Sequence, residues 1–439
     1  MKTAADLGRE IAQGKLDPVE LTEATLEKIE NNAHRDSIFA RLTGERARSE
    51  AEGAAARQKS DSLKSPLDGV PISWKDLFDT RNVATESGSK LLKGRVPEKD
   101  CVPLKFATDA GLVCVGKTHL SELAFSGLGI NPNAATSPNI HGDNLAPGGS
   151  SSGAAASVAH ELVPIGIGSD TGGSVRIPSA WNDLTGFKTT HGLISLEGSV
   201  ALCSGFDTVG PLCRSMEDAW LMTSIMAGLE PVLPETKPVS ECEFLVNETI
   251  MLDELGDNQR EGFEIAIEAL QSAGAKVTRG QIHECNDLLP LGPVLFPYEA
   301  WAEWGMEIEA QPSLMFEPVR NRFESGKGVT REQYDIAKAA MMDLRKSYNQ
   351  RTSLYDAVLA PTVAIAPPEV HPLLADYELF GATNMMALRN TRFFNMLGCC
   401  ALTLPTSKPA SGLMVAAQGG RDRELAGIGL GIEQVLSSP

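Results

Sequence analysis

Apolar residues recur at helical spacing over the first part of the chain, from residue 3 to 58. Between Leu21 and Ile29 they share one stripe with a period near 3.6 residues, which predicts an amphipathic helix. Asp17-Pro18 comes just before this stripe, and proline is favoured at the first position of a helix, so we expect a helix to start there. The charged, alanine-rich stretch 46–57 predicts another, solvated helix.

After this helical part the spacing changes to the two-residue period of a β-strand. Val70, Ile72 and Trp74 alternate with Ser73 and Lys75. Because successive side chains of a strand point to opposite faces, Ser73 and Lys75 are expected on the face opposite the apolar residues.

Strands and helices then alternate up to about residue 230. The apolar runs 111–116 and 162–167 predict buried strands, and the small-residue run 154–159 predicts a helix packed close to a neighbour. Such alternation indicates an α/β core, so the expected fold class is α/β.

The pattern of apolar and polar residues changes again near residue 230. Three prolines between 231 and 238 mark a connection, and helical patterns dominate from residue 259 to 348. Strand-like runs return at 357–361 and 401–404, before a closing helix from about residue 421.

This pattern predicts a single domain over residues 1–439. Its sheet is expected to come from residues 1–230 and 351–439. The region between them, 235–350, is expected to be mostly helical and to lie over the sheet. The chain is long enough to build a large core without disulfides or a metal.

Charge limits the classes of partner. The chain carries 39 lysines and arginines against 57 aspartates and glutamates, a net charge of −18. No basic stripe is available to displace counterions from a nucleic acid, so no nucleic-acid partner is expected. No apolar run approaches the roughly 18 residues of a membrane span, and the N-terminus turns polar too early for a signal peptide. We therefore expect a cytoplasmic protein without membrane contact.

The spacing of the cysteines does not indicate a disulfide framework or a metal site. All eight are scattered and none belongs to a CxxC pair, so free thiols in a reducing compartment are the simplest account. His283 and Cys285 are close in sequence, but nothing around them supplies four ligands at a usual spacing, and no metal or cofactor is expected. Asp76 and Asp79 could form a carboxylate pair, but both suit the turn after the strand.

Two serines stand in glycine-rich segments. Ser150 lies in the segment Pro147-Gly-Gly-Ser-Ser-Ser-Gly153, and Ser174 lies in Gly168-Ser-Asp-Thr-Gly-Gly-Ser-Val-Arg176. Glycine lets backbone N–H groups converge on one point, where they can hold an oxyanion. A serine beside such a point is a candidate nucleophile, and a lysine kept neutral is a candidate base. The pattern predicts a serine hydrolase that acts on amides.

A base is required as well, and no histidine lies near either serine at a recognisable spacing. Lysine can serve only if its pKa falls by about 2–3 units, each worth about 1.4 kcal/mol. Burial of Lys75 in an α/β core would lower its pKa in this way.

Three segments of the chain, 69–76, 147–153 and 168–178, resemble the amidase signature family in residues and spacing. The resemblance implies an α/β/α sandwich around a large mixed sheet. It also implies hydrolysis of the C–N bond of a small carboxylic amide through an acyl-serine intermediate, giving an acid and ammonia or an amine. Region 235–350 matches only loosely, and in this family it is the part that selects substrates.

By this resemblance each catalytic role falls on one residue. Ser174 is the nucleophile, Ser150 is the bridging serine with a cis peptide bond, and Lys75 is the base. Asp170 and Arg176 brace the loop. The oxyanion hole is made by the N–H groups of Thr171, Gly172, Gly173 and Ser174.

Pocket residues are less clearly marked. Tyr298 and Trp301 occur at near-helical spacing in region 235–350, which suits core packing and a wall over the substrate equally well. The sequence does not specify which amide is bound. The expected pocket residues are Phe125, Ser126, Gly149, Tyr298 and Trp301, with Arg389 as a further candidate.

Two other functions and one other nucleophile remain open. The A subunit of a glutamine-dependent aminoacyl-tRNA amidotransferase resembles the same family and would pass ammonia to a partner protein. A catalytically dead scaffold would share the fold. Residues 149–153 also fit the G-x-S-x-G elbow of α/β-hydrolases, with Ser151 as nucleophile and His371 as the late histidine. The expected partner is a small amide, and a homodimer is compatible with the resemblance.

Overall fold

The computed structural model describes residues 2–437, which fold around one mixed β-sheet. Its eleven described strands are β1 (Phe39–Leu42), β2 (Pro71–Lys75), β3 (Val113–Thr118), β4 (Ile165–Ser169), β5 (Thr185–Lys188), β6 (Val209–Cys213), β7 (Glu243–Asn247), β8 (Lys276–Gly280), β9 (Ala357–Pro361), β10 (Cys400–Pro405) and β11 (Gly412–Ala417). Their order across the sheet is β1-β3-β2-β4-β6-β5-β10-β11-β9-β7-β8. Strand β2 runs parallel to β3 and β4, and β4 runs antiparallel to β6.

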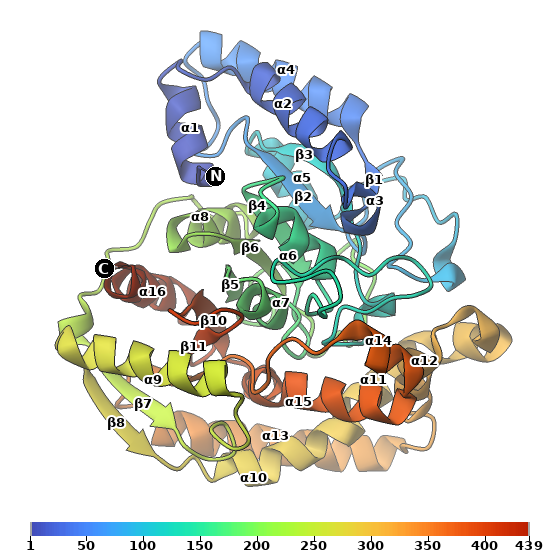
Figure 1. Cartoon of the computed structure of the whole chain (residues 1–439), viewed down its shortest axis with the longest axis vertical. Coiled ribbons are helices and arrows are strands. Elements are labelled where there is room, and N and C mark those ends of the chain that lie inside the picture. The colour runs from blue at the N-terminus through green and yellow to red at the C-terminus, as the bar shows by residue number, and fades with distance from the viewer. Residues whose placement is uncertain (1, 438–439) are drawn as a thin grey trace.

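Helices surround this sheet (Figure 1). The described α-helices are α1 (Ala4–Ala12), α2 (Pro18–Glu30), α3 (Arg35–Ile38), α4 (Gly44–Lys59), α5 (Val102–Asp109), α6 (Ser152–Ala159), α7 (Arg176–Trp181), α8 (Met216–Met226), α9 (Asp257–Ser272), α10 (Glu284–Leu288), α11 (Gly292–Ala310), α12 (Glu317–Glu324), α13 (Arg331–Arg351), α14 (Val370–Ala375), α15 (Tyr377–Met396) and α16 (Asp422–Leu436). Short 3₁₀ turns occur at η1 (Lys90–Leu92), η2 (Glu122–Ala124), η3 (Val239–Glu241), η4 (Leu289–Leu291) and η5 (Pro312–Leu314).

Strand β10 shows that helices cover both faces of the sheet. Leu402 contacts Gly429 of α16, where an added Cβ would lie 2.8 Å from the leucine. The next residue, Thr403, points the other way, because with Gly412 it faces Ala180 of α7. Helices α8, α9 and α16 pack together on the first face, and α6 packs with α7 on the second. The fold is therefore the expected α/β/α sandwich.

Several predicted elements are confirmed with their local cause. Helix α2 begins at Pro18, and the Asp17 carboxylate accepts hydrogen bonds from the N–H groups of Val19 at 2.7 Å and Glu20 at 3.4 Å. This is an N-cap, which satisfies donors that the first turn leaves free. Strand β2 occupies the alternating segment, and both of its faces are buried.

Two regions differ from the prediction. The first part of the chain, expected to be helical throughout, contains strand β1, which pairs antiparallel with β3 at the sheet edge. Region 235–350 does not only lie over the sheet, because β7 and β8 extend it in parallel beyond β9. Strand β7 is mostly buried and apolar, whereas β8 is a largely exposed edge that carries lysine and arginine, residues that discourage further pairing. The rest of the region is mostly helical.

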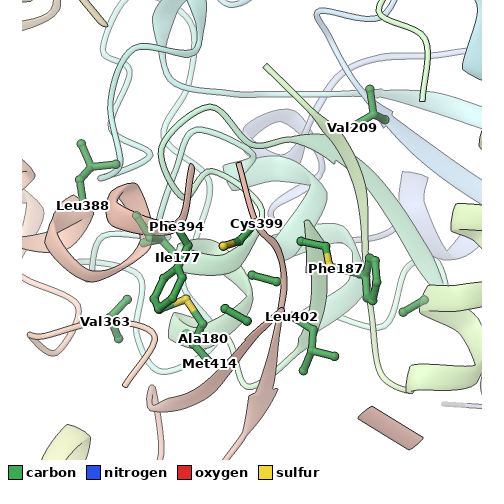
Figure 2. Close-up of a cluster of buried hydrophobic side chains, with 14 of the residues drawn as sticks. Ile177, Ala180, Phe187, Val209, Val363, Leu388, Phe394, Cys399, Leu402 and Met414 are labelled. Carbon is green, nitrogen blue, oxygen red and sulfur yellow. The ribbon is translucent and has the colours of Figure 1, made fainter. Parts of the chain in front are cut away.

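One part of the hydrophobic core lies where α7, α15 and the middle strands meet (Figure 2). Ile177 of α7, Leu388 and Phe394 of α15, and Met414 of β11 are buried there. This packing fixes α7 and the loop before it against a rigid support.

The cysteines and the helix lengths give two further findings. All eight cysteines are free and buried. Within residues 2–437 no helix is long and apolar enough to cross a membrane.

Candidate active site

The site forms where the carboxyl ends of two neighbouring parallel strands meet the start of a helix. Lys75 ends β2, Ser169 ends β4, and the two strands are paired. Ser150 and Ser151 immediately precede α6, which packs on these strands. Three segments that are far apart in sequence thus converge at one point, a usual place for ligand binding in α/β sheets.

Lys75 is completely buried and surrounded by hydroxyl groups. Its Nζ lies 2.7 Å from Ser150 Oγ, 2.8 Å from Ser169 Oγ and 3.1 Å from Ser151 Oγ. Burial lowers the pKa of Lys75 to about 7, although the charges of Asp207 and Asp170 oppose this effect. A large part of the Lys75 population is therefore neutral near pH 7, as a general base requires.

Ser150 follows a cis peptide bond from Gly149 and is fully buried. The next residue, Ser151, is also fully buried and bonded on several sides. Its Oγ donates to the Ser169 carbonyl at 3.2 Å and accepts from the Ser169 N–H at 3.3 Å. Ser151 is thus tied into the sheet, which makes it a poor candidate for the exposed serine of an elbow.

The loop from residue 170 to 176 is organised by one carboxylate. Asp170 accepts hydrogen bonds from the N–H groups of Gly173 at 2.8 Å and Val175 at 3.2 Å. Two nitrogens of the Arg176 guanidinium, each 3.0 Å away, donate to the same carboxylate. Burial alone would raise the pKa of Asp170, but Arg176, Lys188 and Asn395 together outweigh burial and hold that pKa well below its usual range. Asp170 therefore remains a charged brace for the loop.

These bonds change the expected set of oxyanion donors. The sequence predicts the Gly173 N–H as one of four donors, but in the structure Asp170 already accepts its hydrogen bond. The N–H groups of Thr171, Gly172 and Ser174 have no hydrogen-bond partner among the described residues. Three donors of this loop are thus free for an anion, and the fourth fixes the loop instead.

A second buried carboxylate supports the loop from the other side. Thr171 Oγ1 donates to Asp207 Oδ1 at 2.5 Å, while the N–H groups of Leu202 and Cys203 donate to Oδ2. Burial raises the pKa of Asp207 to about 6 despite these bonds. Neither Asp207 nor Ser169 is assigned a role from the sequence. Ser169 is only one position of the glycine-rich segment 168–176, and no local pattern singles out Asp207.

A narrow cavity of about 30 Å³ opens onto Ser174, which is 3% exposed. Phe125 and Ser126, both expected in the pocket, line it together with Thr171 and Gly172. The remaining lining residues are Ala124, Gly127, Leu202, Phe296, Arg322, Leu388 and Arg392.

Four other pocket candidates lie elsewhere. Tyr298 stacks on Tyr334 of α13, with ring centroids 4.3 Å apart, and Trp301 packs beside Gly326, because the face of α11 that carries them is turned toward these neighbours. Gly149 is buried behind the pocket, where a Cβ would collide with Ser121 and Ser126. Arg389 donates to the carbonyl of Asp253 at 2.8 Å instead of lining the cavity.

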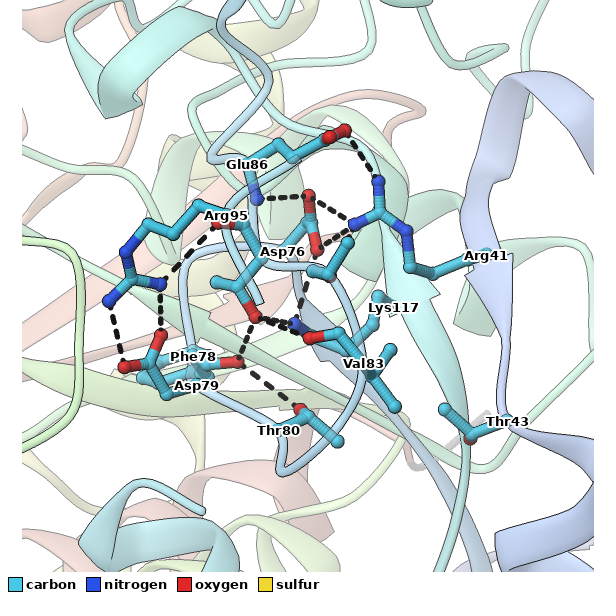
Figure 3. Close-up of polar contacts among 12 residues, drawn as sticks. Arg41, Thr43, Asp76, Phe78, Asp79, Thr80, Val83, Glu86, Arg95 and Lys117 are labelled. Atoms are coloured by element: carbon cyan, nitrogen blue, oxygen red, sulfur yellow. Dashed lines mark hydrogen bonds and ion pairs between the residues drawn. The ribbon is translucent and has the colours of Figure 1, made fainter. Parts of the chain in front are cut away.

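Asp76 and Asp79 have structural partners (Figure 3). Asp76 lies 3.1 Å from Lys117 Nζ and 3.0 Å from Arg41. Asp79 forms a two-pronged contact with Arg95. Both carboxylates hold the turn after β2, as expected, and they do not form an acid–base pair.

The described residues offer no group for a metal. Within residues 2–437 no set of three or more His, Cys, Asp and Glu side chains is arranged to hold an ion. His371, the late histidine of the elbow hypothesis, lies in α14, where its backbone N–H donates to Asn144 at 3.4 Å.

Fold and site together define an α/β protein with a buried lysine, a cluster of serines and a loop of free N–H groups. Comparison with known proteins places it more narrowly. The family model described as Amidase matches residues 20–425, so the chain belongs to the amidase family and is an amidohydrolase of that family.

Individual relatives agree with this assignment. The chain is 32% identical over 352 residues to the A subunit of a glutamyl-tRNA(Gln) amidotransferase of Marinobacter nauticus, covering 74% of this chain and 72% of the relative. It is 31% identical over 411 residues to a 2-amino-5-chloromuconic acid deaminase of Comamonas testosteroni, covering 90% and 87%. A crystal structure of an amidase superposes with a TM-score of 0.89 at 28% identity, covering 99% of this chain and 100% of the other.

Proposed function

We propose that this protein hydrolyses the C–N bond of a small carboxylic amide, with Ser174 as nucleophile, Ser150 as proton bridge and Lys75 as base. The observation that carries the proposal is the 2.7 Å contact between Lys75 Nζ and Ser150 Oγ in a fully buried setting. No carboxylate pairs with this lysine among the described residues, so burial can hold it neutral.

The contact between Lys75 and Ser150 supports the following steps. Ser174 Oγ attacks the amide carbonyl, its proton passes to Ser150 Oγ, and the Ser150 proton passes to Lys75 Nζ. The oxyanion that forms on the carbonyl is stabilised by the N–H groups of Thr171, Gly172 and Ser174. The relay then returns a proton to the leaving nitrogen, ammonia or an amine departs, and water hydrolyses the acyl ester of Ser174.

A second candidate is favoured by the identity to the A subunits of amidotransferases. In that case glutamine would be the amide, and the ammonia would pass to a partner protein. The two candidates share the same Ser174 chemistry and differ in whether a small amide is turned over by this chain alone.

The test is ammonia release from a panel of small primary amides, glutamine included, without ATP or a partner. We expect wild type to turn over at least one amide and Ser174→Ala to lose activity by about 10⁴-fold or more. Ser224→Ala is the matched control, because Ser224 is a buried serine of α8 outside the site, and it should retain activity.

Each other outcome contradicts a stated part of the proposal. Activity that survives in Ser174→Ala would show that the nucleophile is a different residue. Absence of turnover on every amide would reject an autonomous amidase and favour the partner-dependent alternative.

A further inference from the structure

Two arginines enter the cavity of Ser174 from helices that no sequence motif connects with the site. Arg322 lies on α12 and Arg392 on α15, and both line the cavity. Arg322 donates to the Phe125 carbonyl at 3.0 Å, and its guanidinium lies 4.2 Å from the centroid of the Phe125 ring. Each side chain is half-buried.

Arg392 lies against the loop from residue 170 to 176. Its Cγ would lie 3.9 Å from a Cβ added to Gly172, which places the side chain against the residue that carries a free N–H. One guanidinium nitrogen contacts Met385 Sδ at 3.7 Å, and Nε is buried without a hydrogen-bond partner among the described residues. A guanidinium normally has five donors to satisfy, so Arg392 retains most of its capacity.

Neither arginine has a counterion. Among residues 2–437 no Asp or Glu forms an ion pair with Arg322 or Arg392, although Arg176 in the same loop region has Asp170. Burial, together with the charge of Arg392, lowers the pKa of Arg322 to about 9, and burial lowers the pKa of Arg392 to about 10. Two uncompensated cations in one small cavity are costly unless an anion occupies it.

We propose that Arg322 and Arg392 bind a carboxylate on the acyl part of the substrate, so that the enzyme acts on the mono-amide of a short dicarboxylic acid. This inference rests on the proposed function. The planar fork of arginine matches a carboxylate, and two arginines can hold one carboxylate from two sides. Ser174 and both arginines line the same narrow cavity, so the chain between the amide carbonyl and the carboxylate must be short. Hydrolysis of such an amide consumes water and yields a dicarboxylate and ammonia.

The test compares a charged amide with a neutral amide of similar length. Succinamate and butyramide are given to wild type, Arg322→Met, Arg392→Met and Arg345→Met. Arg345 is a suitable control because it is also half-buried and without an ion pair among the described residues, but lies on α13 and donates to the Met396 carbonyl. Each pocket substitution should lower kcat/KM for succinamate by about 10- to 100-fold, the usual range for a hydrogen bond to a charged group. Butyramide has no carboxylate to bind, so each pocket substitution should lower its kcat/KM by a smaller factor than that for succinamate, whereas Arg345→Met should leave kcat/KM for both amides within about threefold.

A binding measurement separates this inference from the proposed function. Calorimetry with succinate on Ser174→Ala should show binding that weakens at least tenfold when Arg322→Met or Arg392→Met is added, and that Arg345→Met leaves unchanged. Loss of amide turnover with intact arginine-dependent succinate binding would reject the proposed function and keep the carboxylate site. Equal turnover of succinamate and butyramide by wild type would overturn the inference. So would an affinity for succinate that neither Arg322→Met nor Arg392→Met changes.

Discussion

Two buried lysines on neighbouring strands have opposite surroundings. Lys75 ends β2 and Lys117 lies on β3, and the two strands are paired so that Trp74 faces Lys117. Both lysines are 0% exposed. Lys117 Nζ lies 3.1 Å from the Asp76 carboxylate and 3.0 Å from Thr85 Oγ1. Lys75 has three serine hydroxyls and, among the described residues, no carboxylate in contact.

The difference shows which surroundings would let a buried lysine act as a base. Burial lowers the pKa of both, but for Lys117 the nearest opposing charge is Asp76 in direct contact. For Lys75 the opposing carboxylates, Asp207 and Asp170, act only from a distance. A carboxylate partner favours the protonated, charged form of a lysine. Hydroxyl partners carry no charge, so they allow the amine to become neutral and can exchange protons with it.

Exchange of each lysine for methionine should separate the two roles. Lys75→Met should lower kcat/KM for the best amide by about 10²–10⁴-fold, the range attributed to general acid–base catalysis. Its thermal midpoint should be no lower than that of wild type near neutral pH, because each unit of the lowered pKa is worth about 1.4 kcal/mol against the folded state.

Lys117→Met should behave in the reverse manner. It leaves Asp76 with only Arg41 as cationic partner among the described residues, so the free energy of unfolding should fall by about 2–4 kcal/mol. The folded fraction should retain most of its activity. Measurement of urea unfolding and kcat/KM on both variants checks the pair, and an inactive but fully stable Lys117→Met would contradict the division of roles.

The pH dependence of activity should reveal the titration of Lys75. The neutral amine is the active form, and its pKa is about 7, so kcat/KM should rise about tenfold per pH unit below pH 7 and level off above it. Lys117→Met should keep this profile. A profile that falls as the pH increases through 7 would show that the protonated form of some group is required.

The stability of the fold should depend on pH for the same reason. The unfolded chain binds the Lys75 proton up to a pKa of about 10.4, whereas the folded chain releases it near 7. Between these values the unfolded state holds more protons, so stability should rise with pH. Urea unfolding measured across this range should show a smaller slope in Lys75→Met.

The sequence was sufficient for the fold class, because the alternation of strands and helices is a local signal. The assignment of Lys75, Ser150 and Ser174 to one site came from the resemblance of their three segments to the amidase signature family. The sequence was insufficient for segments that become strands only by pairing with strands far away in the chain. Strand β1 is four residues long between helices, and only its pairing with β3 makes it a strand. Strands β7 and β8 lie in region 235–350, which was expected to be mostly helical, and their pairing with the sheet likewise makes them strands.

Within the site, the residues that sequence reasoning misses are those that the fold brings in from afar. Arg392 lies three positions after Arg389, the arginine that the sequence suggests for the pocket, and residues at this spacing are neighbours on a helix surface. Only Arg392 reaches the cavity, and no feature of the sequence marks which of the two does so. Likewise, the resemblance places the Gly173 N–H in the oxyanion hole and Asp170 as a brace of the loop, but it does not show that this N–H donates to Asp170.

The smallest expected effect distinguishes two adjacent serines. Ser151→Ala removes one of three acceptors around Lys75 and leaves the Ser169 N–H without its side-chain partner, so it should cost about 1–3 kcal/mol of stability and less than about tenfold in kcat/KM. Ser150→Ala deletes the same single atom at the bridging position and should cost about 10²-fold or more. Steady-state kinetics on both variants, measured beside Ser174→Ala, decide between the relay and the elbow, since an inactive Ser151→Ala together with an active Ser174→Ala would make Ser151 the nucleophile. The comparison is sharp because both serines are buried, adjacent and bonded to the same lysine, whereas only Ser151 is also bonded to the backbone of Ser169.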